Sequence, residues 1–371
     1  MNNQKIRVLH VIDTTGPAGA EIVLLNILKG LDKNIFQSFI VLPDKGWLYK
    51  KLLQLNNITI KIINGRGRFN VLFIYLISKF LIKNKIDIIH SHLFGSSLYC
   101  SIAGILCRVP VICTFHGFAD INPKDKFLKL KFFIIGIWAK KIISVSNTLS
   151  NYLKTIVPLG ERKCITIYNG IEVEKNGKTA KENTTNRLRF SKNDILVGSV
   201  GNIKKVKGYD ILLRAAKYVR KRHKNCYFLI AGARVQKDFF NELLAERKIL
   251  DLEKGFHFIG YKEDVYNFLQ SLDIFVLPSI TEGFSLATIE AMNAGIPVVA
   301  TKSGGPEEII INNKNGILVN SGDQISLADG ISRLIENKML REQFVITAKK
   351  TIIERFQIST MIQKYEDLYS K

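Results

Sequence analysis

The feature that most constrains the fold is the alternation of short apolar runs with segments of helical periodicity along almost the whole chain. Short continuous apolar runs are typical of strands buried on both faces of a parallel sheet, and parallel strands are joined by helical crossovers. The pattern therefore predicts two doubly wound α/β units with parallel sheets. The runs that predict strands are 7–12, 38–42, 59–62, 86–90, 111–115, 141–145 and 164–167, then 195–200, 227–232, 256–259, 274–277, 297–301 and 316–319.

The length of 371 residues suits two domains of ordinary size. The stretch 172–186 is polar and offers almost nothing to bury, so we interpret it as the linker between them. The predicted domains are 1–180 and 187–354, followed by a closing helix over 355–371.

Composition limits the class of protein. A hydrophobic content of 47% with 8 prolines argues against extended disorder. The five cysteines form no Cys-x-x-Cys pair, and we expect buried free thiols in a reducing compartment. We also expect no leader peptide and no transmembrane helix, because 69–82 is too short and 88–107 carries histidines, glycine and serines.

The net charge of +22 is uneven, since residues 1–180 hold 25 Lys and Arg against 10 Asp and Glu. No zinc-finger spacing or RNA-binding signature accompanies this charge, so we expect no nucleic-acid partner. The segment 124–133 interleaves lysines with bulky apolar side chains, which favours peripheral contact with an anionic membrane. The alternative is an ordinary helix that buries one face and solvates its lysines.

Two carboxylates near the end of the chain predict a ligand site. Glu282 follows the expected strand 274–277, and Glu290 lies inside the next expected helix, for which Ser285 is the N-cap. Open α/β sheets bind ligands at the carboxyl ends of their strands, and helical side chains tilt toward the N-terminus. Free backbone N–H groups at Phe284, Ser285 and Leu286 would face an anion there.

Carboxylates accept hydrogen bonds from hydroxyls and a helix N-terminus binds phosphate, so this site is suited to a nucleotide sugar. The alternative is a surface glutamate beside a helix-capping glutamate. Further segments can be compared with known families: Pro278-Ser279 with Glu282-Gly283-Phe284 and Glu290, Gly295-Ile296-Pro297-Val298-Val299, Gly304-Gly305-Pro306-Glu307-Glu308, Gly201-Asn202 with Lys207-Gly208, Tyr168-Asn169-Gly170-Ile171-Glu172, Thr114-Phe115-His116-Gly117 and Gly19-Ala20-Glu21. These segments resemble the retaining, GT-B-fold glycosyltransferases of family 4, and they follow that family's order over nearly the whole chain.

The resemblance implies a GT-B fold, in which two Rossmann-like domains face each other across a cleft and the C-terminal helix crosses back to the first domain. The first domain would bind the acceptor and the second the nucleotide sugar. No Asp-x-Asp diphosphate–metal motif occurs in the chain, so we expect no metal and no cofactor beyond the nucleotide-sugar co-substrate.

The resemblance also implies roles for individual residues. Glu282 would bind hydroxyls of the transferred sugar, assisted by the backbone of Gly283, Phe284, Ser285 and Leu286. Glu290 would hold the ribose, and Lys207 would neutralise the pyrophosphate. Gly19 would approach the phosphates from the first domain, where a residue without Cβ lets the backbone come close.

His116 would sit beside the reacting sugar; its alternative role is a structural cap hydrogen-bonded to backbone. The family usually has arginine where this chain has Asn202, and an amide supplies neither charge nor bidentate pairing to phosphate. Whether Lys204 or Lys205 replaces that charge is left open. His90 and His92 suggest a metal pair, but we expect their side chains to point to opposite faces, with structural or ligand-facing roles.

The predicted function is a retaining glycosyltransferase of the hexosyltransferase type. It would move sugar from a nucleotide-diphosphate sugar, a UDP-sugar by family frequency, to a glycan or lipid-linked acceptor. We expect it to act in bacterial lipopolysaccharide or capsule synthesis, in the cytoplasm or peripherally on the inner face of the plasma membrane. The alternatives are a nucleotide-sugar epimerase or hydrolase on the same fold, and a non-catalytic nucleotide-sugar-binding protein.

Overall fold

The computed structural model describes residues 4–65, 70–173 and 190–371. The chain folds into two compact units, which we call unit 1 (Met1–Gly170 with Ile358–Lys371) and unit 2 (Ile171–Gln357). The division at Gly170 precedes the predicted end of the first domain. The predicted linker 172–186 lies almost entirely outside the described residues.

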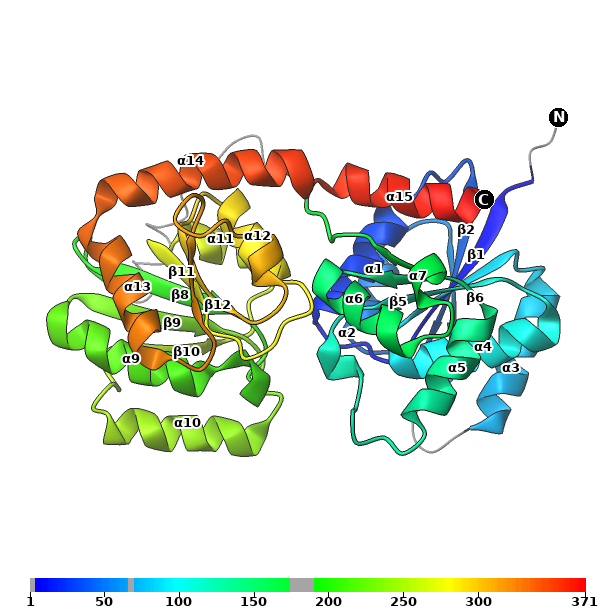
Figure 1. Ribbon diagram of the computed structural model, residues 1–371, viewed down its shortest axis with the longest axis horizontal. Helices are drawn as coiled ribbons and strands as arrows, with labels where there is room; N and C mark the ends of the chain where they lie inside the picture. The colour runs from blue at the N-terminus through cyan, green and yellow to red at the C-terminus, as the bar shows by residue number, and fades with distance from the viewer. Residues whose placement is uncertain (1–3, 66–69, 174–189) are drawn as a thin grey trace. The chain divides into compact units, whose positions relative to one another are not determined.

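Unit 1 is built on a parallel sheet with the strand order β3-β2-β1-β4-β5-β6-β7 (Figure 1). Its strands are β1 Ile6–Ile12, β2 Phe36–Leu42, β3 Ile58–Ile62, β4 Ile88–His92, β5 Val111–Phe115, β6 Ala139–Ser144 and β7 Cys164–Thr166. Its helices are α1 Gly19–Gly30, α2 Trp47–Leu52, α3 Val71–Asn84, α4 Phe94–Cys107, α5 Leu128–Trp138, α6 Asn147–Ile156, α7 Gly160–Lys163 and α15 Ile358–Ser370, with a 3-10 turn η1 at Phe118–Asp120.

Unit 2 repeats the plan on a parallel sheet of order β10-β9-β8-β11-β12-β13. Its strands are β8 Ile195–Val200, β9 Cys226–Ala231, β10 Phe256–Gly260, β11 Ile274–Leu277, β12 Val298–Lys302 and β13 Ile317–Asn320. Its helices are α9 Tyr209–Arg222, α10 Lys237–Ile249, α11 Val265–Gln270, α12 Leu286–Asn293, α13 Gln324–Glu336 and α14 Lys338–Arg355, with 3-10 turns η2 at Lys205–Lys207 and η3 at Pro306–Glu308.

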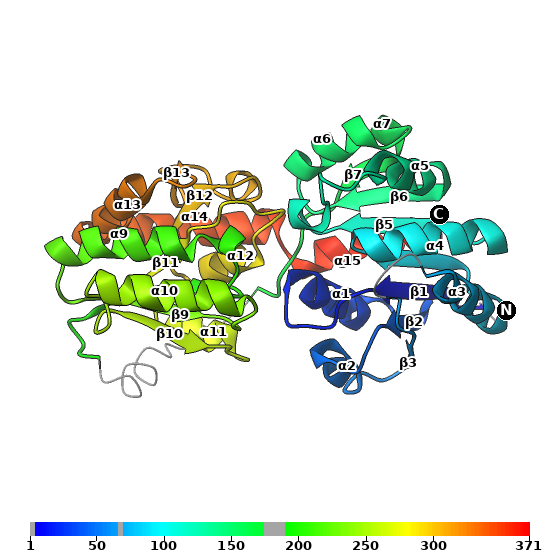
Figure 2. The same cartoon turned by 90° about the horizontal axis from the view of Figure 1, so that it is seen from below.

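Each sheet reverses its winding at the strand that begins the unit. In unit 1 the reversal lies between β1 and β4, and in unit 2 between β8 and β11. Right-handed crossovers place the helices before and after a reversal on opposite faces of the sheet. Helices α3, α4 and α5 accordingly pack in sequence on one face, while α15 packs against α1 and β1 (Figures 1 and 2). The loops at a reversal diverge, which leaves room for a ligand.

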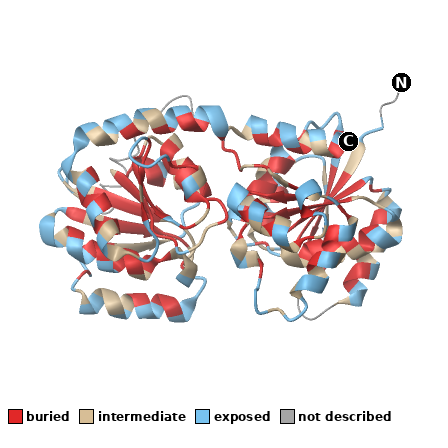
Figure 3. Cartoon of the chain, in the orientation of Figure 1, coloured by how far each residue is buried: buried red, intermediate tan, exposed pale blue. Residues whose placement is uncertain are grey.

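The thirteen predicted strands each coincide with one strand of the described residues, so the prediction of parallel α/β units is confirmed. The apolar runs work as signals because the inner strands of each sheet are buried on both faces, as Figure 3 shows, whereas the edge strands β3 and β10 are only partly buried. All five cysteines are free, and four of them are buried. None of the helices in the described ranges has the length and apolarity needed to cross a bilayer.

Candidate active site

The first loop of the site follows β11 in unit 2 and holds Glu282. Its Oε1 atom accepts hydrogen bonds from Lys207 Nζ at 2.5 Å and from Ser279 Oγ at 2.7 Å. The side chain of Glu282 is 9% exposed and that of Lys207 is 25% exposed. This ion pair is largely shielded from water, so each charge loses hydration. The short contact between the two side chains must replace that lost hydration. The structure thus brings together the two charged residues that the sequence analysis placed in the same site.

Lys207 reaches Glu282 because the chain packs closely around Gly208. Gly208 has φ +64° and opens α9, and a Cβ atom on it would lie 2.1 Å from the carbonyl oxygen of Pro278. Only glycine permits both this left-handed conformation and this approach. A backbone hydrogen bond from Ile280 N to Val206 O, 2.8 Å long, ties the same two loops together. The N-terminal end of α9 therefore lies against the carboxyl end of β11.

A second loop, after β12, supports the Glu282 loop from the other side. Glu282 N donates to Ser303 O at 2.8 Å, and Gly305 N donates to Glu282 O at 3.2 Å. The carboxylate of Glu307 accepts from the backbone N–H groups of Ser303 and Gly304 at 3.1 and 2.9 Å. Glu307 belongs to the Gly304-Gly305-Pro306-Glu307-Glu308 motif, which by itself predicts no role for this residue. Its structural role is to hold the loop that positions Glu282.

Helix α12 follows directly and begins as predicted. Ser285 is its N-cap, and its Oγ accepts hydrogen bonds from Thr288 N at 3.2 Å and Thr288 Oγ1 at 2.9 Å. The short segment from Glu282 to Leu286 therefore carries a carboxylate and then the N-terminus of a helix. Backbone N–H groups at such an end attract anions.

Glu290 lies in the second half of α12 and is half-buried. Burial raises the pKa of its carboxyl group from 4.5 to about 7, because desolvation disfavours the charged form. A carboxyl kept near neutrality at a cost in stability is typical of functional sites.

Asn202 follows β8 on the other side of the reversal point. Its Oδ1 atom accepts a hydrogen bond from Ala233 N at 3.3 Å, so part of its role is to join the loops after β8 and β9. Lys204 is half-buried and Lys205 is exposed. Lys204 is the N-cap of η2 and Lys205 is its first residue, so two positive charges lie within a few residues of Asn202.

In unit 1, Gly19 is exposed and is the first residue of α1, where its N-cap neighbour Ala18 makes no side-chain cap hydrogen bond. His116 follows β5, and its backbone N–H donates to Asp120 Oδ2 at 3.3 Å. Its Nε2 atom lies 3.2 Å from Nδ1 of His92, within hydrogen-bond distance. Burial lowers the pKa of His116 to about 3, so the ring is neutral at ordinary pH.

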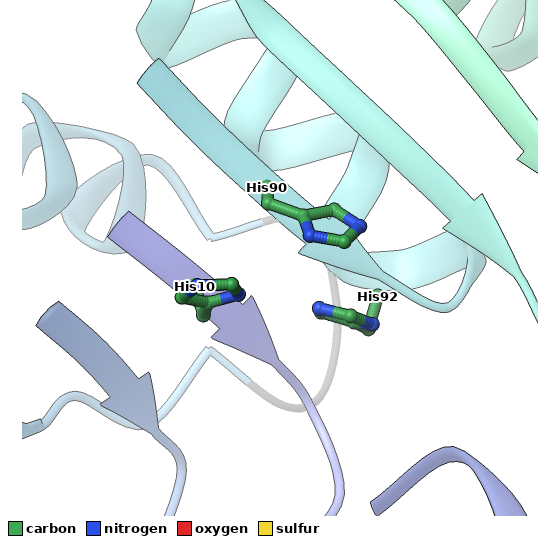
Figure 4. Close-up of side chains that lie close together, drawn as sticks. All are labelled: His10, His90 and His92. Atoms are coloured by element: carbon green, nitrogen blue, oxygen red, sulfur yellow. The ribbon is translucent and has the colours of Figure 1, made fainter. Parts of the chain in front are cut away.

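His92 belongs to a cluster of buried imidazoles with His10 and His90 (Figure 4). The expectation that His90 and His92 point to opposite faces is wrong, because their ring centroids are 4.1 Å apart. Side chains alternate along a strand with a period of two, so residues two apart share a face. His90 also lies 2.5 Å from Tyr369 Oη and 2.7 Å from Thr114 Oγ1, which links the cluster to α15.

One ring nitrogen of each of the three histidines lies within 4.8 Å of the others, a set that can be tested against metal coordination. Both nitrogens of His90 already have hydrogen-bond partners, whereas both nitrogens of His10 and Nε2 of His92 have none in the described part of the chain. The rings of His10 and His92 are stacked at 25°, an arrangement in which in-plane lone pairs run side by side. A metal would require both a change of partner at His90 and a rotation of one stacked ring.

Unit 1 also contains a cavity of about 420 Å³ at its reversal point, next to the ends of β1 and β4. It is lined mainly by apolar and aromatic side chains, and its polar groups come from Asp13, Thr14, Ser96, Tyr99 and Lys131. Mostly apolar walls with a few polar groups are typical of small-molecule sites. This cavity is not predictable from the sequence, since the residues that form it come from segments far apart in the chain.

Two parallel-sheet units with this strand order are the GT-B fold, and solved structures agree. A crystal structure of Anabaena Alr3699/HepE in complex with UDP and glucose matches with a TM-score of 0.88 at 21% identity, covering 98% of this chain and 99% of that chain. Sucrose-phosphate synthase from Thermosynechococcus elongatus matches with a TM-score of 0.83 at 16% identity, covering 98% of both chains. The fold defines the class as a GT-B protein.

The sequence comparisons identify the family within that class. Residues 17–175 match Glycosyltransferase Family 4, and residues 180–351 match Glycosyl transferases group 1. The chain belongs to the group 1, family 4 glycosyltransferases, as the resemblance indicated.

Curated relatives extend the comparison. An Escherichia coli UDP-Gal:alpha-D-GlcNAc-diphosphoundecaprenol alpha-1,3-galactosyltransferase is 29% identical over 301 residues, which is 78% of this chain and 77% of the relative. The Staphylococcus aureus capsular polysaccharide biosynthesis glycosyltransferase CapM is 25% identical over the same share of each chain. An E. coli O-antigen biosynthesis glycosyltransferase, WclY, is 24% identical over 98% of both chains.

Proposed function

We propose that this glycosyltransferase moves a sugar from a nucleotide-diphosphate sugar to a hydroxyl of a glycan or lipid-linked acceptor, with retention of the anomeric configuration. The observation that carries the proposal is the Lys207–Glu282 pair at the reversal point of unit 2. A cation for diphosphate and an acceptor for sugar hydroxyls stand side by side there, next to the N-terminal ends of α9 and α12.

The geometry of Glu282 supports sugar binding. Its two hydrogen bonds fall on the same oxygen, Oε1, so Oε2 is the atom that would accept hydrogen bonds from hydroxyls of the transferred sugar. Lys207 would then move its charge toward the pyrophosphate and stabilise it as it leaves. Preorganised charges of this kind act where charge develops in the transition state.

The neighbouring residues would bind the rest of the donor. The backbone N–H groups that open α12 would face the diphosphate, and Asn202 with Lys204 or Lys205 would contact it from the β8 side. Glu290 would accept hydrogen bonds from the ribose hydroxyls. Because those bonds favour the ionised carboxylate, donor binding would lower the raised pKa of Glu290 and release a proton.

The proposed mechanism uses a front-face attack, in which a leaving-group phosphate oxygen helps to deprotonate the acceptor hydroxyl. His116 would orient the reacting sugar as a neutral hydrogen-bonding group, since burial keeps its pKa near 3. Gly19 would bring backbone close to the phosphates. Positioning and electrostatic stabilisation would supply the rate enhancement, with Lys207 rather than a metal ion carrying the positive charge.

The relatives favour a uridine donor and a surface glycan. Alr3699/HepE was crystallised with UDP-glucose, and the E. coli relative uses UDP-Gal with a diphosphoundecaprenol-linked acceptor. Two other relatives act in O-antigen and capsule synthesis. We infer a UDP-hexose donor and a lipid-linked acceptor at the inner face of a bacterial membrane, where unit 1 would bind the acceptor.

A thermal-shift series with UDP, GDP, ADP and their sugars tests the donor. Wild type should be stabilised by one nucleotide series, by ~2.7 kcal/mol at about 100 times the dissociation constant. Glu290→Ala should lose this shift, while Glu242→Ala on the exposed face of α10 should keep it. The absence of a shift with every nucleotide would contradict the proposal.

Product analysis separates the alternative functions. Release of free sugar or formation of an epimeric donor without any acceptor would indicate a hydrolase or epimerase. Nucleotide binding without turnover on any acceptor would indicate a non-catalytic binding protein. The proposal requires transfer that depends on both donor and acceptor, with the anomeric configuration of the product matching that of the donor by NMR.

A further inference from the structure

Helix α5 of unit 1 exposes large apolar side chains to solvent. Leu130, Phe133 and Ile137 recur at helical spacing on its outer side and are 55%, 51% and 52% exposed. Phe132 and Ile135 on its inner side are fully buried. A helix that is apolar all round is normally enclosed by protein or lipid, yet the outer side of α5 is open.

The neighbouring helices also expose large apolar side chains. The exposed stripe of α3 carries Val71, Leu72, Tyr75 and Ile82, and the last turn of α4 carries Ile105 and Leu106. Helices α3, α4 and α5 pack in sequence on one face of the sheet (Figures 1 and 2). We call the exposed apolar residues of these helices, together with Phe127, the apolar face: Val71, Leu72, Tyr75, Ile82, Ile105, Leu106, Phe127, Leu130, Phe133 and Ile137. Large apolar side chains exposed on several neighbouring helices are typical of interaction sites.

The positive charges around the apolar face favour an anionic partner. The segments 70–108 and 122–140 contain nine Lys and Arg residues against two Asp residues. One of the two, Asp125, is paired with Lys131 at 2.5 Å. Exposed Lys79, Lys83 and Lys129 lie among the apolar residues, where their long aliphatic stems can follow an apolar phase while their charges meet anions.

We propose that the apolar face docks unit 1 on an anionic lipid bilayer, with the apolar side chains in the headgroup–acyl boundary and the lysines on lipid phosphates. A second copy of this chain is a poorer partner, because two strongly cationic faces would repel each other. The interpretation of 124–133 as an ordinary helix with one solvated polar face does not fit α5, since its solvated side is itself apolar.

The cavity of unit 1 lies among the same helices. Phe73 of α3, Tyr99 of α4 and Lys131 of α5 all contribute to its lining. Docking through the apolar face would bring this cavity to the level of lipid headgroups, where the sugar of a lipid-linked acceptor could enter it. This last step rests on the proposed function, whereas the docking itself does not.

The test is co-sedimentation of the full chain with phosphatidylcholine vesicles, with and without phosphatidylglycerol. Wild type should bind the anionic vesicles more tightly, and added salt should weaken that binding. Leu130→Gln/Phe133→Gln should lower the partition coefficient by about tenfold or more, because two large apolar side chains are lost from the interface. Lys126→Gln/Lys129→Gln should remove roughly fivefold per lysine on anionic vesicles only.

Ile249→Gln/Ile346→Gln is the matched control, since both residues are exposed apolar positions on helices of unit 2 and this pair should bind like wild type. Equal far-UV circular dichroism and equal nucleotide-induced thermal shifts would show that each variant is folded and keeps its donor site. Wild type that binds neither vesicle, or an apolar-face variant that binds like the control, would overturn the proposal. Self-association of wild type without lipid, lost in Leu130→Gln/Phe133→Gln, would assign the face to a second copy instead.

Discussion

Replacing Glu290 by glutamine should stabilise unit 2 while weakening nucleotide binding. In the folded protein burial raises the pKa of the carboxyl group from 4.5 to about 7. The unfolded chain thus releases this proton at lower pH than the folded chain does. Stability falls as pH rises above about 4.5, and the loss is complete above about pH 7. Glutamine does not titrate, so the variant escapes this loss.

The size of the effect follows from the two pKa values. One pK unit corresponds to about 1.4 kcal/mol, so ionisation of Glu290 costs the wild type about 1.4 kcal/mol at pH ~5.5 and about 3 kcal/mol at pH ~8. The amide of glutamine costs roughly 1–2 kcal/mol at every pH if its N–H groups lack partners. The informative quantity is therefore the difference in free energy of unfolding between the variant and the wild type. This difference should increase by about 2 kcal/mol in favour of the variant from pH ~5.5 to pH ~8.

Chemical unfolding at the two pH values measures this growth. Both tryptophans, Trp47 and Trp138, belong to unit 1, so their fluorescence follows that unit, while far-UV circular dichroism follows both units. The change should appear in the dichroism transition and be absent from the fluorescence transition. Glu242→Gln, an exposed substitution on α10, should show no such growth.

Calorimetric titration with nucleotide completes the test. Wild type should release a proton on binding, visible as a dependence of the measured heat on the buffer's ionisation enthalpy, and Glu290→Gln should bind more weakly with little release. A variant whose advantage is the same at both pH values, or which is less stable than wild type at pH ~8, would refute the burial argument. Unchanged nucleotide affinity would refute the ribose contact.

Three further predictions concern the remaining charges. Lys207→Met should lower the transfer turnover by about 10²–10³, since it removes the cation aimed at the leaving diphosphate; steady-state kinetics with near-normal turnover would contradict this role. Lowering the pH from about 7 to about 5 should destabilise unit 1 by ~2 kcal/mol for each of His10 and His116, because the unfolded rings gain protons near pH 6.5 and the folded rings only near 3; tryptophan fluorescence unfolding measures it, and a flat profile would count against the buried neutral cluster. EDTA should leave transfer unchanged, and mass spectrometry of the purified protein should find no stoichiometric metal; activity lost in EDTA and restored by Zn²⁺ would assign the cluster of His10, His90 and His92 to a metal.

The sequence predicted the elements of the fold well because each signal is local. Most strands contain a short apolar run, and Ser285 is followed three residues later by the N–H group that it caps. The helix following 285 and the strand preceding 278 together place Glu282 in a loop at a strand end. These inferences need only the spacing of residues and the stereochemistry of short segments.

Other features of the site depend on contacts between distant segments, which one sequence does not specify. Glu307 holds the loop beside Glu282 through two backbone N–H groups, and nothing in its motif says which groups it contacts. The facing of His90 and His92 was predictable from strand periodicity, and the expectation failed because it applied the rule for adjacent residues to residues two apart. The exposure of apolar residues on α5 was not predictable for another reason. Both sides of this helix carry apolar residues, and the sequence does not show which side packs against the sheet.

The reversal of the sheet in unit 2 accounts for the position of the Lys207–Glu282 pair. At the reversal between β8 and β11, the connection after one strand leaves on one face of the sheet and the connection after the other leaves on the opposite face. Lys207 comes from the first connection and Glu282 from the second, and Gly208 lets the two approach until Nζ and Oε1 are 2.5 Å apart. Neither connection alone carries both charges. A diphosphate that draws Lys207 away would leave Glu282 needing a new hydrogen-bond donor, and a sugar hydroxyl on the same ligand would supply one. Under the proposed function the pair would therefore favour ligands that carry both groups, which would give this site a physical reason to distinguish a nucleotide sugar from a free nucleotide.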